Sequence, residues 1–406
     1  MAAPLEGGAL RIVVTVPWGE RLGGAETLLQ TVLDGVHESA HELELVFLQP
    51  GAWPRELREA GFRVEVLAAG RLREPWRWAA TVIALARILR DRRPDLLLDW
   101  AAKTHLYGAP AALLAGMGGK VVWWQHLIAD GHWVDRCATA LPARAVLCCS
   151  AAAARAQAQL SPARPTYVVR AGAPVAGDDG VLPAAGDAGV SLAVGNDGVS
   201  PVARDNGGPP AQSRLPIGVP VVGLVGRLQP WKGQDRLLRA HALLRERGCE
   251  LHTVLVGGDA YGFSSAYAAS LPALVQRLGL ADAVTLTGQV PDAGPYIERM
   301  DILVNASDPE PFGIVLLEAM ARGVPVVAVD AGGPAEFIAP GDSGLLARSG
   351  EPEALADAIE PLLREPALRA RLGGAGRERY LGEFTDRALR TRLFARLEEI
   401  AGSAAA

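Results

Sequence analysis

Residues 301–323 read DILVNASDPEPFGIVLLEAMARG and contain a strand, a loop and a helix in close succession. The apolar run at the start is typical of a buried strand, and the residues from Asp308 to Pro311 form turns. The apolar run from about Gly313 to Ala321 predicts a helix. Because strands and helices alternate in doubly wound folds, this segment predicts one strand–loop–helix unit of such a fold.

Two glutamates stand out in this stretch: Glu310 in the loop and Glu318 within the apolar helix. A buried carboxylate is unfavourable unless a partner offsets its desolvation. The free N–H groups and the positive dipole end at the start of the helix form an anion site. These features indicate a ligand with both phosphate and hydroxyl groups, such as a nucleotide sugar. Two simpler interpretations stay open, namely that Glu310 is a solvated turn residue and that Glu318 pairs with Arg322.

Short apolar runs alternate with amphipathic helical runs on both sides of this stretch. The first apolar run is Leu10–Val16, and a loop with Gly23–Gly24 and a helix follow it. Repeated alternation predicts doubly wound parallel sheets that bind ligands at the carboxyl ends of their strands. In the first half of the chain, this rule draws attention to the strand-end residues Trp18, Trp100, Lys103, His105, Gln125 and His126.

The length of 406 residues favours two domains, because one hydrophobic core rarely serves so long a chain. We expect an N-terminal Rossmann-like domain over 1–175 and a C-terminal one over 215–382. A last helix lies within 383–406, and a return of this helix to the first domain is one option. Residues 176–214 are rich in Gly, Ala, Asp and Pro without periodicity, which predicts a loop or linker without a chemical role.

Composition excludes several classes of protein. The net charge of −5 argues against nucleic acid as a partner, because nucleic-acid binding relies on a basic surface. No signal peptide and no transmembrane helix is expected from the apolar runs. Peripheral membrane contact is left open but is not indicated, because the basic segment 87–93 is short. The four cysteines lack metal-ligand spacing, and with these features they favour a reducing, cytoplasmic location.

The segment GRLQPWKG (226–233) places two cations, Arg227 and Lys232, between a strand and a helix. Arginine offers a planar donor fork and lysine a compact charge, and this pair is well suited to a diphosphate. His126 ends the predicted strand KVVWWQH, where either a structural hydrogen bond or a catalytic role suits a histidine.

These motifs, in this order and spacing, resemble the retaining glycosyltransferases of family 4. That family has the GT-B fold, in which two Rossmann-like domains face a central cleft. The resemblance spans nearly the whole chain and is most specific in its second half. The segments that carry it are GGAE (23–26), His126, GRLQPWKG (226–233), GQV (288–290), EPFGIVLLEAMARGVPVV (310–327) and GGPAEFI (332–338).

The resemblance implies a role for each matching residue. Arg227 and Lys232 would hold the donor diphosphate and stabilise the departing charge. Glu318 would bind the ribose, Glu310 the sugar hydroxyls, and His126 would lie near the transferred sugar. The residues implied to carry the transfer are Glu310, His126, Arg227 and Lys232. The donor-binding residues would further include Gly24, Val290, Phe312, Gly313, Ile314 and Val315.

The activity that the resemblance implies is retaining, metal-independent sugar transfer from a nucleoside-diphosphate sugar to an acceptor hydroxyl. No cofactor is expected, and the triplet DPE (308–310) is not taken as a metal site because it precedes the anion-binding helix. UDP, GDP, ADP and TDP donors stay open, as do small-molecule, glycan and lipid-linked acceptors. The alternatives are a sugar-nucleotide epimerase, a phosphorylase of related fold, or a non-catalytic nucleotide-sugar-binding protein.

Overall fold

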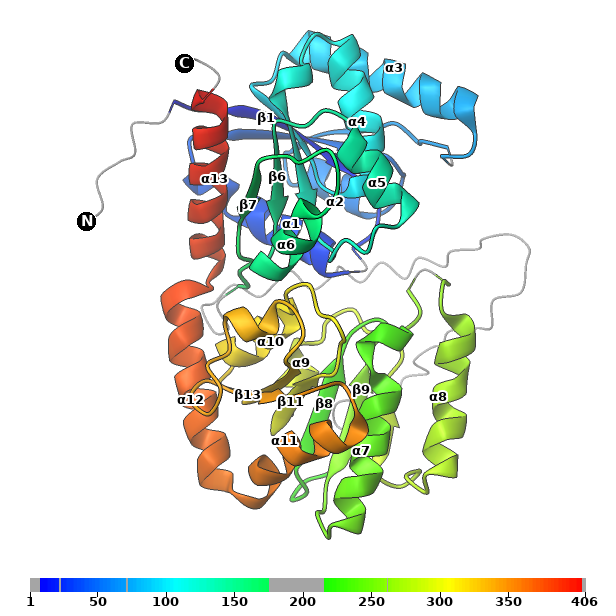
Figure 1. Ribbon diagram of the computed structural model, residues 1–406, viewed down its shortest axis with the longest axis vertical. Coiled ribbons are helices and arrows are strands. Elements are labelled where there is room, and N and C mark those ends of the chain that lie inside the picture. The colour runs from blue at the N-terminus through cyan, green and yellow to red at the C-terminus, as the bar shows by residue number, and fades with distance from the viewer. Residues whose placement is uncertain (1–7, 22, 71, 175–214, 261, 404–406) are drawn as a thin grey trace. The chain divides into compact units, whose positions relative to one another are not determined.

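The computed structural model describes residues 8–21, 23–70, 72–174, 215–260 and 262–403. These residues form two compact units (Figure 1). Unit 1 comprises the described residues of Met1–Ala173 and Phe384–Ala406, and unit 2 those of Pro174–Glu383. The expected linker over 176–214 lies outside the described residues.

Unit 1 is built on a seven-stranded parallel sheet in the order β3-β2-β1-β4-β5-β6-β7. The strands are β1 (Arg11–Val16), β2 (Glu42–Phe47), β3 (Arg63–Val66), β4 (Leu96–Asp99), β5 (Val121–Gln125), β6 (Ala145–Cys148) and β7 (Thr166–Val168). The helices are α1 (Gly24–Asp34), α2 (Trp53–Glu59), α3 (Pro75–Arg92), α4 (Ala102–Leu114), α5 (Trp133–Ala140), α6 (Ala151–Ala158) and α13 (Asp386–Gly402), with short 3-10 turns at η1 (Val36–Glu38) and η2 (Gly118–Lys120).

Unit 2 is built on a six-stranded parallel sheet in the order β10-β9-β8-β11-β12-β13. The strands are β8 (Val221–Val225), β9 (His252–Val256), β10 (Val284–Leu286), β11 (Ile302–Asn305), β12 (Val326–Val329) and β13 (Leu345–Ala347). The helices are α7 (Gln234–Glu246), α8 (Ser265–Arg277), α9 (Gly294–Ile297), α10 (Ile314–Ala321), α11 (Pro352–Arg364) and α12 (Pro366–Glu383), with 3-10 turns at η4 (Pro230–Lys232) and η5 (Pro334–Glu336).

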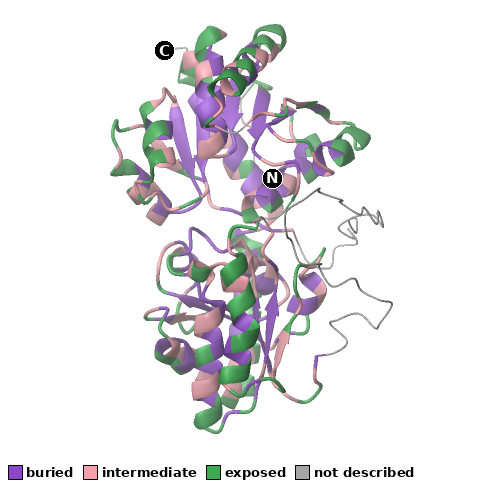
Figure 2. Ribbon diagram, turned by 90° about the vertical axis from the view of Figure 1, so that its right-hand side faces the viewer, coloured by how far each residue is buried: buried purple, intermediate pink, exposed green. Residues whose placement is uncertain are grey.

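Strands β4, β5, β6, β11 and β12 are buried along their whole length, and the exposed residues lie mainly on the outer sides of the helices (Figure 2). Parallel strands that helices cover on both faces need continuous apolar runs, which explains why sequence alone locates them. In unit 2, Leu237 and Leu238 of α7 pack with Leu355 and Ile359 of α11 in one buried cluster. Burying each such side chain contributes about 2 kcal/mol.

Each sheet has one place where the order of its strands reverses. In unit 1 this place lies between β1 and β4, and in unit 2 it lies between β8 and β11. The loops that follow the two strands run to opposite faces of the sheet there and leave a crevice at the carboxyl ends, where doubly wound folds bind ligands. The topology therefore marks one candidate ligand position in each unit.

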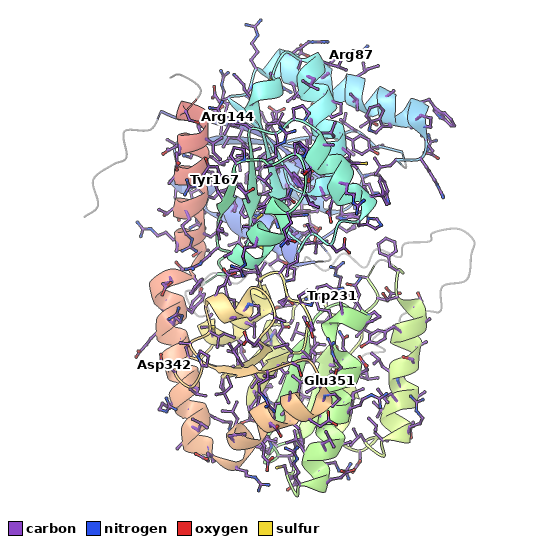
Figure 3. All side chains as sticks on the ribbon, in the orientation of Figure 1. Arg87, Arg144, Tyr167, Trp231, Asp342 and Glu351 are labelled. Atoms are coloured by element: carbon purple, nitrogen blue, oxygen red, sulfur yellow. The ribbon has the colours of Figure 1, made fainter. Side chains whose placement is uncertain are left out.

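The last helix, α13, belongs to unit 1, and two of its arginine side chains contact residues of that unit. Arg390 is 7% exposed and donates a hydrogen bond of 2.7 Å to Asp386. Its guanidinium lies over Gly35, where a Cβ atom would be 2.1 Å from Cζ, so a side chain at that position would displace the guanidinium. The guanidinium of Arg396 lies 4.5 Å from the ring centroid of Tyr167, which Figure 3 labels beside α13.

The predicted strands and helices agree with the structure except at one element. β13 was not expected, because its three residues lie between turns and are too few to show a period. The order of the strands was not predicted either. Among the helices in the described part of the chain, none is both long enough and apolar enough to cross a membrane.

Candidate functional site

The residues predicted to bind a ligand in unit 2 lie at the carboxyl edge of its sheet. Arg227 and Lys232 follow β8, and the segment from Glu310 to Val315 follows β11. Because β8 and β11 flank the strand reversal, the topology brings these two loops together although they are far apart in sequence.

Lys232 and Glu310 form a direct ion pair at this reversal. The Lys232 Nζ atom donates to Glu310 Oε2 at 2.7 Å, with side-chain exposures of 18% and 7%. The same Nζ atom lies 4.1 Å from the ring centroid of Trp231, which Figure 3 labels on the loop before α7. Lys232 therefore has a fixed position between a carboxylate and an aromatic face, with part of its charge still accessible to a ligand.

Glu310 is a buried carboxylate with several donors. Asn305 Nδ2 donates to its Oε2 atom at 3.1 Å. Burial alone would raise the pKa of Glu310, but the charge of Lys232 and hydrogen bonds from Lys232, Ser307 and Asn305 hold it below its ordinary value. The interpretation of Glu310 as a solvated turn residue is therefore wrong. Asn305 and Ser307 were not predicted as site residues; the available signal was two polar residues at the carboxyl end of an apolar strand.

The backbone around Glu310 is braced by the loop after β12. The N–H group of Glu310 donates to the Ala331 carbonyl at 2.9 Å, and the N–H group of Gly333 donates to the Glu310 carbonyl at 2.8 Å. A Cβ atom on Gly333 would lie 2.4 Å from the Pro311 carbonyl oxygen and 2.6 Å from Phe312 Cα. Only a glycine allows this approach of backbone to backbone, which holds Glu310 and the start of α10 in register.

The N-terminus of α10 presents main-chain donors at the same edge. Gly313 has a φ of 95° in the left-handed region and caps the helix without a side-chain hydrogen bond. The first-turn N–H groups of Ile314 and Val315 have no partner within the helix. The Phe312 ring is buried and stacks on Phe337 with centroids 5.0 Å apart, so a ligand would meet the Phe312 backbone rather than its ring.

Glu318 is half-buried on α10, and its carboxylate is not the partner of Arg322. Among the described residues, Arg322 donates to the main-chain oxygen of Glu318 at 3.1 Å and forms its ion pair with Glu298 at 3.4 Å. Burial raises the pKa of Glu318; Arg322 partly offsets this rise, and Asp292 adds to it. The carboxylate is thus left for another donor, and a pair of hydroxyl groups would suit it.

The remaining predicted donor-side residues lie on neighbouring loops. Arg227 is half-buried, and its carbonyl accepts a hydrogen bond of 2.9 Å from Gln234, which fixes the loop after β8. Val290 is half-buried in the loop after β10. The Gly257 N–H group donates to the Gly288 carbonyl at 3.1 Å and ties this loop to the end of β9.

In unit 1, His126 lies against two tryptophans. Its ring centroid is 5.1 Å from that of Trp100 and 5.3 Å from that of Trp124, which it stacks at 14°. Its Nε2 atom has no accessible surface and no hydrogen-bond partner among the described residues. Burial lowers the pKa of His126 to about 3, and a main-chain hydrogen bond with Trp100 opposes this shift only partly. The imidazole is therefore neutral at ordinary pH.

We expect His126 to stay neutral down to about pH 5 and to make the protein acid-sensitive. In the unfolded chain its pKa is about 6.5, so below that pH the unfolded chain binds a proton that the folded one does not. Stability therefore falls as the pH drops from about 6.5 towards 3. NMR titration with labelled histidine checks the protonation, and thermal melts of His126→Phe should show a smaller loss on acidification. Protonation of His126 at pH 6 in the folded protein would contradict the prediction.

Two other strand-end residues of unit 1 have structural partners. The imidazole Nδ1 atom of His105 lies 2.9 Å from Asp99 Oδ2, and Asp99 Oδ1 accepts a hydrogen bond of 2.6 Å from Thr15. All three are fully buried. Gln125 donates to Asp135 at 3.1 Å. These contacts hold the ends of the strands, and the second ring nitrogen of His105, Nε2, is buried without a hydrogen-bond partner among the described residues.

The segments after β1 and β4 meet through two side-chain contacts. Trp100 is buried and donates from its indole to the Ala25 carbonyl at 2.9 Å, next to Gly24, which begins α1 and is exposed. Trp18 and Lys103 are half-buried, and the Lys103 Nζ atom lies 3.7 Å from the Trp18 ring centroid. Of the tryptophans singled out at strand ends, Trp100 therefore has a core position and Trp18 a position at the sheet edge.

Two parallel Rossmann-like sheets, each with one strand reversal at its carboxyl edge, define the GT-B class. The family model "Glycosyltransferase Family 4" matches residues 22–175, and the family model "Glycosyl transferases group 1" matches residues 210–379. Together they match most of the chain in both units. The chain belongs to the group 1 glycosyltransferases of family 4.

Curated relatives match part of the chain. The lipopolysaccharide core biosynthesis mannosyltransferase LpcC of Rhizobium leguminosarum bv. viciae is 38% identical over 148 residues, which are 36% of this chain and 42% of that protein. The D-inositol 3-phosphate glycosyltransferase of Frankia alni is 38% identical over 187 residues, or 43% of this chain and 46% of that protein. The matched segments span less than half the length of these relatives.

Solved structures match nearly the whole chain. Anabaena HepE in complex with UDP-glucose has a TM-score of 0.75 and 24% identity, and the match covers 96% of this chain and all of that one. The sucrose-phosphate synthase of Thermosynechococcus elongatus also has a TM-score of 0.75, with 22% identity over 97% of this chain and all of that one. At this identity the similarity supports the shared fold.

Proposed function

We propose that this protein is a retaining, metal-independent glycosyltransferase that moves a sugar from a nucleoside-diphosphate sugar to an acceptor hydroxyl. The observation that carries the proposal is the ion pair of the partly exposed Lys232 with the buried Glu310 at the strand reversal of unit 2. It lies beside the free N–H groups of α10, as a ligand with diphosphate and sugar hydroxyls requires.

The leaving diphosphate would develop negative charge as its bond to the sugar breaks. Lys232, Arg227 and the N-terminus of α10, which follow β8 and β11, would stabilise that charge. Glu310 accepts from donors and is ionised, so it suits the sugar hydroxyls better than an acid catalyst's role. Glu318, without an ion pair to Arg322, suits the ribose hydroxyls.

In a retaining reaction without a covalent intermediate, the acceptor hydroxyl would attack from the face that the diphosphate leaves. The departing phosphate oxygen would accept the proton of that hydroxyl, and the neutral His126 would lie near the transferred sugar without changing charge. Among the described residues, no cluster of three or more His, Cys, Asp or Glu side chains suits a metal ion. Metal independence itself is tested by chelation.

Thermal-shift screening with UDP-, GDP-, ADP- and TDP-sugars tests the donor. A ligand at 100 times its dissociation constant stabilises the folded state by about 2.7 kcal/mol, so a true donor stands out. NMR of the product then reports the anomeric configuration, and EDTA should leave the rate unchanged. An inverted product would disprove retention, and a loss of turnover on chelation would disprove metal independence.

The same screen separates transfer from the alternatives. Incubating the stabilising sugar nucleotide without an acceptor should give at most slow hydrolysis. Conversion to its C2 epimer would replace the transferase proposal by an epimerase. Tight donor binding with no turnover against a broad set of hydroxyl acceptors would favour a non-catalytic binding protein.

A further inference from the structure

We propose that Lys103, set over the Trp18 indole, recognises an anionic group on the acceptor, either a phosphate or a carboxylate. The proposal rests on the proposed function, because it assigns a substrate class to the acceptor side of the same reaction. It concerns unit 1 alone and gives Lys103 the role of a specificity-determining residue rather than a catalytic one.

The pair of Trp18 and Lys103 lies at the strand reversal of unit 1. Trp18 follows β1 and Lys103 follows β4, and these strands flank the strand reversal of unit 1. Thr15 pairs with Asp99 at the ends of the same two strands, which brings the loops together. Lys103 thus occupies in unit 1 the kind of position that Lys232 occupies in unit 2, where doubly wound folds bind ligands.

Lys103 has an unfavourable electrostatic setting. It lies in the first turn of α4, at the positive end of the helix dipole, where a cation is disfavoured. Its ammonium is half-buried, and burial lowers its pKa to about 8. No carboxylate lies within ion-pair distance of it in the described part of the chain. The Trp18 face, with its centroid at 3.7 Å, is the contact that compensates it.

Lys103 differs from Lys232 in having no carboxylate partner among the described residues. Both ammonium groups lie over a tryptophan face, but Lys232 also has the Glu310 carboxylate at 2.7 Å. The one buried carboxylate at the end of β4, Asp99, is already bound to Thr15 and His105. An anion brought by a ligand would give Lys103 the partner that the described residues do not provide. A neutral acceptor would leave the ammonium with the Trp18 face as its contact and no opposite charge.

The small number of lysines allows the Lys103 side chain to be observed by NMR. Three of its 40 Lys and Arg residues are lysines: Lys103, Lys120 and Lys232. Reductive ¹³C-methylation therefore gives few NMR signals, which Lys→Arg variants assign. Lys120 is exposed directly before β5, at the amino end of that strand, and donates to the Pro94 carbonyl, so it is the matched control.

The probes are glucose, glucose 6-phosphate and glucuronate, which share a ring and differ in charge. We expect the phosphate or the carboxylate to shift the Lys103 signal and raise its pKa, with glucose inert and Lys120 unaffected by all three. Comparing glucose 6-phosphate with glucuronate shows whether Lys103 prefers a phosphate or a carboxylate. An equal response of Lys120, or no response of Lys103 to either anion, would overturn the proposal. A response of Lys103 to UDP alone would assign it to the donor and also overturn it.

Kinetics give the second test, with acceptors screened as charged and uncharged pairs. Lys103→Met should raise KM for the anionic acceptor about tenfold to a hundredfold, the range for a charge-assisted hydrogen bond. Its kcat and donor-induced thermal shift should change little, Lys103→Arg should restore part of the affinity, and Lys120→Met should match wild type. If wild type binds no donor, the proposed function fails. If wild type transfers but prefers neutral acceptors, or Lys103→Met affects both members of a pair alike, only the role of Lys103 fails.

Discussion

Replacing Lys232 by methionine is expected to lower kcat/KM for sugar transfer about a hundredfold to a thousandfold, the usual cost of removing one donor to a developing oxyanion. Two effects combine in this variant. The leaving diphosphate loses a cation, and Glu310 loses the partner that holds it in place at 2.7 Å. Initial rates with the donor identified by thermal shift, compared with Lys120→Met, measure the effect.

The same substitution separates the pair's catalytic role from its structural one. Because Lys232 holds the pKa of Glu310 low, the pair stabilises the fold above the ordinary pKa of a glutamate, and this contribution is lost as the pH falls through the lowered value. Lys232→Met leaves a buried carboxylate without its cation, so it should cost about 1–3 kcal/mol at neutral pH. Lys232→Met/Glu310→Gln should recover part of that stability yet stay inactive. Wild-type turnover in Lys232→Met would rule out the assigned role.

The alternation of apolar strands and amphipathic helices made most of this fold predictable, because buried parallel strands cannot include polar residues without cost. β13 was not predicted because its sequence LLA, at Leu345–Ala347, is too short to show a hydrophobic period. The order of the strands was beyond sequence reasoning for a different reason. A parallel crossover joins any two strands with a similar loop, so local residues do not record which neighbour a strand receives.

In the candidate site, too, single residues were predictable from the sequence, but the contacts between residues far apart in the chain were not. Single residues such as Glu310 and Lys232 stood out by their charge in apolar or glycine-rich surroundings. Their pairing did not, because 78 positions separate them and only the strand reversal brings them together. That the Glu318 carboxylate forms no ion pair with Arg322 was also not predictable from the sequence, since an arginine four residues on is the ordinary partner in a helix. Here Arg322 bonds to the main chain and to Glu298.

Gly333→Ala is expected to lower transfer about a hundredfold, although the added methyl group touches no charged side chain. The new Cβ atom would lie 2.4 Å from the Pro311 carbonyl oxygen and 2.6 Å from Phe312 Cα, and both belong to the backbone. Because the N–H group of Gly333 also bonds to the Glu310 carbonyl, the loop cannot yield without moving that residue. A displacement of about 1 Å at the donor is enough for a loss of this size.

Stability measurements show whether the loss comes from the site or from the fold. Forcing one methyl group into packed backbone costs about 1–3 kcal/mol, so Gly333→Ala should melt earlier but still fold. Its thermal shift with the donor should shrink, because Gly313 and the start of α10 follow the displaced Phe312. The matched control is Gly374→Ala in α12, where a Cβ atom meets nothing within 4 Å; it should gain about 0.5–1 kcal/mol and keep full activity. If Gly333→Ala bound the donor as tightly as wild type, donor binding would not depend on the contact between Gly333 and the backbone of Pro311 and Phe312. The Lys232–Glu310 pair would then hold the donor without that contact.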